Sequence, residues 1–120
     1  MSLDHAVVWL DDAHAQIIHF DWRHADSRVL PRGTESLDAW YEALAAMVTD
    51  AEEILVAGTG ASPRQFTGWV QQVSPAQRAR IFEVQSLGRL SDRDLLAHAR
   101  RYFQRVDRPH HIEPDDALAA

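Results

Sequence analysis

The 120-residue chain contains no cysteine and no lysine, and it has only five glycines and five prolines. Without cysteine it forms no disulfide, no zinc–thiolate site and no iron–sulfur cluster, and thiol catalysis is excluded. Its longest uninterrupted apolar run is about five residues, whereas a membrane-spanning helix needs roughly twenty. No apolar segment follows a basic start, as it would in a secretory signal. These absences favour a cytoplasmic protein that has no membrane segment.

The overall composition is typical of one folded domain. Apolar residues make up 46% of the chain and charged residues 25%, which is the usual balance for a globular fold. The net charge of −6 argues against a nucleic-acid-binding surface over the whole molecule. All twelve basic residues are nevertheless arginine. Genome base composition is one explanation, but every guanidinium group can still make forked contacts to phosphate or carboxylate.

Short β-rich runs dominate the first third of the chain. His5–Leu10 and Ala15–Phe20 are separated by a short acidic turn, which predicts an antiparallel hairpin. Ser27–Leu30 predicts a third, weaker strand that ends where Pro31 interrupts it.

The hydrophobic period changes to that of helices after residue 34. Apolar residues in Leu37–Val48 recur at steps of three and four, which predicts a helix with Thr34 as its N-cap and Glu35 in its first turn. Glu53–Gly58 is an unbroken apolar run that predicts a strand covered on both faces.

A second and a third helix are predicted further along the chain. Ser62 is expected to cap the second helix, with Pro63 at its first position and Gln65 closing a capping box. Residues 81–84 predict another strand, and Ser91 is expected to cap the last helix. The expected buried stripes are Phe66, Trp69, Val70 and Val73 in the second helix and Leu95, Ala99, Tyr102, Phe103 and Val106 in the last.

This order of elements predicts an α/β fold. An antiparallel N-terminal meander followed by parallel strands needs one mixed sheet, packed here with about three helices. Ribonuclease-H-like domains have this layout. The single domain is expected to span residues 1–106. Residues 107–120 contain two prolines, a histidine pair and acids, which predict a flexible tail.

The segment Gly58, Thr59 and Gly60 is a candidate anion loop. It lies between a buried strand and a helix start, where free backbone N–H groups and the helix dipole favour a phosphate, with Arg64 nearby. Its spacing matches neither a P-loop nor a dinucleotide-binding fingerprint. The alternative interpretation is a tight turn that joins the strand to the helix.

Five aspartates lie in the first 26 residues. Paired carboxylates can hold two magnesium ions in a nuclease, and here Asp11 or Asp12 would be the first ligand and Glu42 a partner on the following helix. The strand that ends at Gly58 carries no acid at its close, however, and solvated turn aspartates are the alternative. The seven histidines have no zinc-binding spacing. No metal, cofactor or catalytic triad is therefore predicted.

Arginines concentrate in the last predicted helix, at Arg93, Arg100, Arg101, Arg105 and Arg108. The last three of these follow steps of four and three, so they are expected to form one ridge. Such a ridge can pair with a phosphate backbone in a strongly salt-dependent manner. The alternative is a solvated face whose arginines favour the negative end of the helix.

Several segments resemble a known family. His5–Asp11 and Ala15–Asp21 resemble the opening of small bacterial proteins called "translational machinery protein", which are similar to the middle domain of archaeal and eukaryotic peptide-chain release factors and of Pelota. Ala51–Phe66 resembles the strand–glycine–helix segment of that domain, and Ser91–Phe103 the closing helix of the bacterial group. The resemblance implies a ribonuclease-H-like domain with a link to ribosomes. Release factors act through a Gly-Gly-Gln tripeptide, which this sequence lacks, so it does not imply peptidyl-tRNA hydrolysis.

These observations predict a non-catalytic, translation-associated domain. It is expected to contact ribosomal or transfer RNA, or a ribosome-bound protein, through the arginines of the last helix together with Arg64. Two alternatives remain open. One is a magnesium-dependent nuclease that uses Asp11 or Asp12, and the other is an interaction module that forms a homodimer through an edge strand of the meander.

Overall fold

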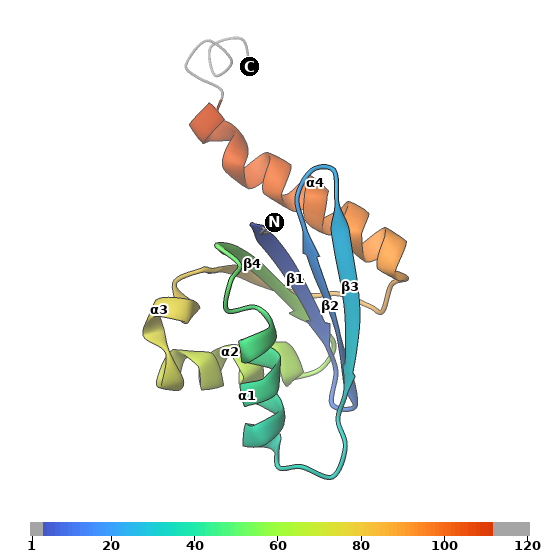
Figure 1. The fold of residues 1–120 in the computed structure, drawn as a ribbon, viewed down its shortest axis with the longest axis vertical. Coiled ribbons are helices and arrows are strands. Elements are labelled where there is room, and N and C mark those ends of the chain that lie inside the picture. The colour runs from blue at the N-terminus through green and yellow to red at the C-terminus, as the bar shows by residue number, and fades with distance from the viewer. Residues whose placement is uncertain (1–3, 112–120) are drawn as a thin grey trace.

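The computed structural model describes the backbone of residues 4–111 and the side chains of residues 4–106. One mixed five-stranded sheet lies between helices on both of its faces (Figure 1). The predicted α/β class is therefore confirmed. No helix in residues 4–111 is long and apolar enough to span a membrane. The elements are, in chain order, β1 (His5–Leu10), β2 (His14–Phe20), β3 (Ala25–Pro31), α1 (Leu37–Met47), β4 (Glu53–Gly58), α2 (Ser62–Val73), α3 (Pro75–Arg78), β5 (Ile81–Ser86) and α4 (Asp92–His111).

The strands are arranged in the order β3-β2-β1-β4-β5. β1 pairs antiparallel with β2, with Leu10 opposite Ala15, and β2 pairs antiparallel with β3. β4 runs parallel to both β1 and β5. The predicted antiparallel meander and the parallel strands that follow it are thus confirmed, and β1 and β4 form the buried centre of the sheet.

Side chains of β1 alternate between two cores, as a period of two requires. Ala6, Val8 and Leu10 pack against α1 and α2, whereas Val7 and Trp9 pack against α4. All of them are fully or almost fully buried. The helix residues of the first core are Trp40, Tyr41, Leu44, Ala45, Phe66 and Val70.

The core under α4 is rich in aromatic rings. The ring of Phe103 lies 4.7 Å from that of His5, 6.1 Å from that of Phe20 and 5.0 Å from that of Tyr102. Aromatic contacts of this kind add stability beyond the apolar area that they bury. They hold the C-terminal half of α4 against the sheet.

Both predicted caps of the first two helices are wrong. The N-cap of α1 is Ser36, whose hydroxyl accepts from the N–H of Ala39 at 3.1 Å, and Thr34 precedes the helix. The N-cap of α2 is Ala61, which makes no side-chain cap, and Ser62 lies inside the helix. The predicted capping box of α2 is therefore not formed.

The buried stripe of α2 also differs from the prediction. Val73 is 60% exposed, and the buried position on that face is taken by Thr67. The hydroxyl of Thr67 donates to the carbonyl of Pro63 at 2.8 Å, which satisfies it inside the core. The short helix α3 follows, with Ser74 as its cap. No helix is predicted from the sequence between the second helix and the strand at residues 81–84.

The last helix starts as predicted and ends later. The hydroxyl of Ser91 accepts from the N–H of Asp94 at 3.1 Å, which confirms this cap. The backbone of residues 107–111, predicted as part of a tail, continues α4 as far as His111. Residues 112–120 of the predicted tail lie outside the described residues.

Candidate functional site

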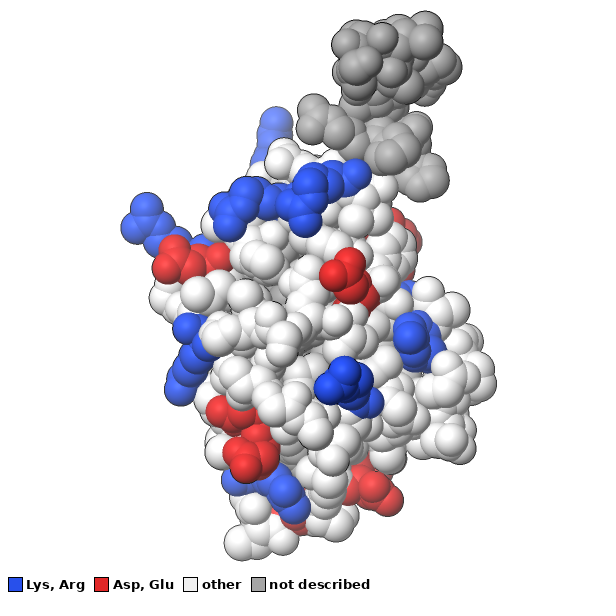
Figure 2. Space-filling model, turned by 180° about the vertical axis from the view of Figure 1, so that it is seen from behind, with Lys and Arg blue, Asp and Glu red and all other residues white. Residues whose placement is uncertain are grey.

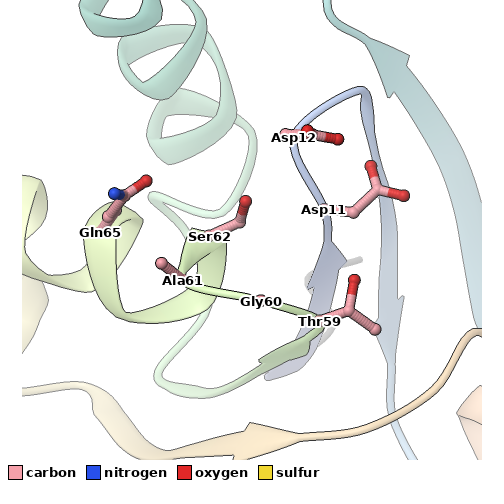
Figure 3. Close-up of a pocket in the computed structure, with 7 residues that line it drawn as sticks. All are labelled: Asp11, Asp12, Thr59, Gly60, Ala61, Ser62 and Gln65. Atoms are coloured by element: carbon pink, nitrogen blue, oxygen red, sulfur yellow. The ribbon is translucent and has the colours of Figure 1, made fainter.

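A surface hollow lies at the carboxyl ends of the two central parallel strands. The chain leaves β1 toward β2 and leaves β4 in the opposite direction toward α2 and β5. In open α/β sheets such a switch in direction is where ligands usually bind. The hollow has a volume of about 320 Å³. It is lined by Asp11, Asp12, Thr59, Gly60, Ala61, Ser62 and Gln65 (Figure 3).

Asp11 closes the turn between β1 and β2. Its carboxylate accepts from the backbone N–H groups of Ala13 and His14 at 2.8 and 2.9 Å, and it lies 3.2 Å from the His14 ring nitrogen Nδ1. Burial alone would raise the pKa of Asp11, but these N–H groups and His14 together hold it below its usual value. The Asp11 carboxylate is thus committed to the turn.

The predicted anion loop lies in this hollow, but the hollow offers an anion little positive charge. The N–H of Thr59 already donates to the carbonyl of Leu10 at 3.3 Å. Arg64 is exposed on α2 and does not line the hollow, whereas the carboxylates of Asp11 and Asp12 do. The geometry therefore favours the interpretation of this loop as a tight strand-to-helix turn.

The carboxylates suggested for a nuclease are brought together only in part. Asp11 and Asp12 line the hollow, but Glu42 is exposed on α1 and does not. Among the described residues, no group of three or more histidine, aspartate or glutamate side chains is arranged to hold a metal ion. The hollow therefore contains the candidates for the first ligand, Asp11 and Asp12, but neither the helix carboxylate nor the acid at a later strand end that the nuclease interpretation requires.

The arginines of α4 point to different sides of the helix. Arg100 donates from Nε and Nη2 to the carbonyl of Asp21 at 3.1 and 2.8 Å, and from Nη2 to the carbonyl of His24 at 3.3 Å. Its guanidinium carbon also lies 6.0 Å from the centre of the Phe20 ring. Arg100 therefore stabilises the turn between β2 and β3, and its guanidinium group already has hydrogen-bond partners within the protein.

Arg101 and Arg105 project from the outer side of α4. Both are exposed, and the guanidinium carbon of Arg105 lies 6.0 Å from the centre of the Tyr102 ring. They are one helical turn apart, so their side chains are neighbours. Figure 2, which views the face covered by α4, shows positive side chains gathered in a band on that face. We refer to Arg101 and Arg105 as the arginine pair.

His98 locates the arginine pair on the flank of α4 that faces β5. The ring nitrogen Nε2 of His98 is hydrogen-bonded to Gln85 Oε1 at 2.8 Å. Burial lowers the pKa of His98, and the charges of Arg101 and Arg105 lower it further, whereas Glu83 opposes them. Both guanidinium groups therefore lie near the part of α4 that contacts β5.

The remaining predicted arginines do not join this pair. Arg93 is exposed at the start of α4, and Arg64 lies on α2, across the sheet. The side chain of Arg108 lies outside the described residues. The arginines that were predicted as one contact surface are thus divided between both faces of the molecule.

A polar network that the sequence analysis missed anchors the start of α4. The amide of Gln16, which is only 4% exposed, donates to the carbonyl of Leu90 at 3.3 Å and to Asp92 Oδ1 at 2.9 Å. The hydroxyl of Ser27 donates to Asp92 Oδ2 at 2.6 Å. These two donors lower the pKa of Asp92. The signal available in the sequence is Gln16, a polar residue between the apolar residues Ala15 and Ile17.

The comparisons with known proteins agree at the level of the fold. No family model and no curated protein matches the chain. Among solved structures, Archaeoglobus fulgidus Pelota is similar with a TM-score of 0.63 and 12% identity, over 84% of this chain and 32% of that one. The archaeal translation termination factor aRF1 is similar with a TM-score of 0.59 and 8% identity, over 89% and 42%. Dom34 of S. cerevisiae is similar with a TM-score of 0.58 and 11% identity, over 78% and 31%.

These likenesses confirm part of the predicted resemblance. The chain has the fold of a segment of Pelota and of an archaeal release factor, and it spans less than half the length of each. The resemblance to the bacterial family has no matching family model to support it.

Proposed function

We propose that this chain is a non-catalytic, translation-associated domain that contacts RNA through the arginine pair. The observation that carries the proposal is the exposed arginine pair on a fold shared with Pelota and aRF1. The similar protein Dom34 is described as a translation termination-like factor that is involved in RNA quality control and interacts with Hbs1. We infer the translation-associated role of this chain from that shared fold.

The chemistry of the arginine pair suits phosphate groups. Each guanidinium group is planar and permanently charged, and it can donate two parallel hydrogen bonds to one phosphate. Because the protein carries a net charge of −6, binding depends on this local charge and not on the overall field. Two phosphate contacts predict a modest salt dependence, with a slope of about −1 to −2 in a plot of log K against log salt concentration.

The test is cosedimentation with purified ribosomes through sucrose gradients at low and high salt. We expect the wild-type protein to sediment with ribosomes at low salt and to be released at high salt. Arg101→Gln/Arg105→Gln should abolish most of the bound fraction. The matched control is Arg32→Gln/Arg64→Gln, which removes the same charge from exposed residues on the side of α1 and α2.

Two outcomes would contradict the proposed contact. The wild-type protein would stay at the top of the gradient at both salt concentrations, or the two double variants would lose the same amount of binding. The non-catalytic part has a separate test, in which structured RNA is incubated with the protein and magnesium. Cleavage that disappears in Asp11→Asn would establish the nuclease alternative instead.

A second candidate function is homodimerisation through β3. This strand is the edge of the sheet, and its side chains are exposed except for the half-buried Leu30. The exposed Val29 favours pairing with another strand, whereas the charges of Asp26 and Arg28 are typical of edges that avoid it. Light scattering over a range of protein concentrations tests for this dimer, because a dimer through β3 dissociates into monomers on dilution.

A further inference from the structure

Phe82 presents an aromatic ring at the edge of the sheet. It lies on β5, the edge strand opposite to β3, and 42% of it is exposed. Its ring makes a T-shaped contact with the buried ring of Phe103, with 5.8 Å between their centres. The contact holds the Phe82 ring in place while much of its surface remains accessible. The ring is thus a rigid and accessible aromatic surface, and aromatic residues are enriched at binding interfaces.

A bulge in β5 places Phe82 and Glu83 on the same face of the sheet, the face that α4 covers. Ile81 pairs with Ile54 and Glu83 with Leu55, so Phe82 is the extra residue between two consecutive pairs. Bulges redirect side chains and are frequent next to functional sites. Ile81 packs into the core under α1 and α2, and the contact with Phe103 shows that the Phe82 ring lies on the opposite face.

The arginine pair lies on the same face as Phe82. His98, Arg101 and Arg105 follow steps of three and four on α4 and so share one side of it, and the His98 ring is hydrogen-bonded to Gln85 on β5, the strand of Phe82 and Glu83. The surface thus runs from the ring through Glu83 to the arginine pair. The carboxylate of Glu83 already accepts from Gln85 Nε2 at 3.2 Å. Its charge repels phosphates from the strand and leaves the guanidinium groups of α4 as the place where they bind.

An aromatic ring beside guanidinium groups matches the two parts of a single-stranded nucleic acid. An unpaired base can stack on an exposed ring, and the phosphates that follow it bind to cations at the side. In a duplex the faces of the bases are covered by their neighbours, so a ring at the protein surface gains nothing from them. A surface made of cations alone would not distinguish the two forms.

We propose that Phe82 and the arginine pair form a binding surface for single-stranded RNA. One unpaired base stacks on the Phe82 ring, and the adjacent phosphates bind to Arg101 and Arg105. This inference rests on the proposed function and specifies the form of RNA that is bound. It also assigns a role to a residue that the proposed function does not use.

The experiment measures fluorescence anisotropy with a labelled 12-nucleotide adenosine strand and with a 12-base-pair RNA duplex. We expect wild-type protein to prefer the single strand. Phe82→Leu should weaken single-strand binding roughly tenfold and leave duplex binding unchanged, because leucine retains apolar packing but cannot stack. Phe82→Tyr should restore binding. Arg101→Gln/Arg105→Gln should weaken binding of both forms.

A matched control replaces another exposed apolar residue, Val73→Ala, which lies on α2 and should leave binding unchanged. Urea unfolding of Phe82→Leu shows whether the variant is folded, and Phe82→Tyr tests stacking independently of it. Equal binding by Phe82→Leu and wild type, with weaker binding by the double arginine variant, would overturn the stacking inference and leave the proposed function standing. Ribosome binding that depends on the arginine pair, without oligonucleotide binding, would have the same effect. If neither ribosomes nor oligonucleotides respond to the arginine pair, the proposed function fails as well.

Discussion

The two faces of the sheet are covered to different extents. α1 and α2 cover one face, and the core between them and the sheet includes both Trp40 and Phe66. Among residues 4–111, α4 is the one helix that covers the other face, and the core beneath it contains fewer residues. One helix cannot extend across five strands, so the sheet beside α4 retains accessible side chains such as Phe82. Positive charge and exposed aromatic surface are therefore combined on the less covered face, and not at the hollow at the strand ends.

The largest expected effect is a loss of stability on substitution of Gly58, the last residue of the central strand β4. A Cβ added at Gly58 would lie 1.9 Å from the carbonyl oxygen of Leu10, and the residue has a φ of +153°. We therefore expect Gly58→Ala to lower the free energy of unfolding by about 4 kcal/mol or more. Urea unfolding followed by circular dichroism measures this change.

Gly60→Ala is the control for that substitution. Its φ is +65°, but no atom lies within 4 Å of the added Cβ, so a cost of only about 1 kcal/mol is expected. Equal costs at Gly58 and Gly60 would show that backbone conformation, and not the close approach to β1, makes Gly58 necessary.

The next effect compares the two cores directly. Phe103→Ala and Phe66→Ala each remove a fully buried ring, and each should cost about 3–5 kcal/mol. Phe103 contacts four other rings, including that of Phe82. Its loss should therefore also weaken single-strand binding, measured at a urea concentration where both variants are folded. Equal binding by the two variants would show that the proposed RNA surface does not depend on the core under α4.

A smaller effect separates two adjacent arginines on α4. Arg100→Gln removes hydrogen bonds to the carbonyls of Asp21 and His24, so we expect a loss of about 1–2 kcal/mol of stability. Its affinity for RNA should stay close to that of the wild type. Arg101→Gln should show the reverse, with unchanged stability and weaker binding. Thermal unfolding of both variants measures the change in stability, and fluorescence anisotropy measures the change in affinity for RNA.

The smallest effect is a pH dependence at the start of α4. Hydrogen bonds from Ser27 and Gln16 hold the pKa of Asp92 below its ordinary value of 3.8. A carboxylate with a lowered folded-state pKa stabilises the protein above its ordinary pKa, and this contribution is lost as the pH falls through the folded-state value. Asp92→Asn should therefore cost less than about 1 kcal/mol at pH 7, because the group is exposed.

The measurement for Asp92 is urea unfolding of both proteins between pH 3 and pH 7. The difference between wild type and Asp92→Asn should shrink below the ordinary pKa, since the ionised form alone carries the stabilisation. A difference that stays constant over this range would show that the shape of the side chain, and not its charge, anchors α4.

The order of strands and helices could be predicted because hydrophobic period is a local property. The hairpin and the buried strand at Glu53–Gly58 follow from short apolar runs, and the buried face of the last helix follows from apolar residues at steps of three and four. The helix starts were less accessible. Ser36 and Thr34 are both good caps in isolation, and the structure uses the one that brings Trp40 and Leu44 onto the sheet.

The candidate sites show the same division. The loop at Gly58 and the acids at Asp11 and Asp12 were predicted separately, and only the pairing of β1 with β4 brings them into one hollow. Phe82 was counted as an ordinary strand residue, because nothing in its neighbours along the chain indicates a bulge or the open edge of β5.

Composition and local periodicity were sufficient for the class of fold, the order of the strands and the three long helices, and most of the residues that form the cores. They could not distinguish Arg100 from Arg101, since adjacent helical positions point about 100° apart, and the strand order is what brings a turn beneath the first and solvent beside the second. Hydrophobic pattern is encoded within a few residues. The surroundings of a charged side chain depend on segments far away in the chain, which meet only when the sheet and its helices pack.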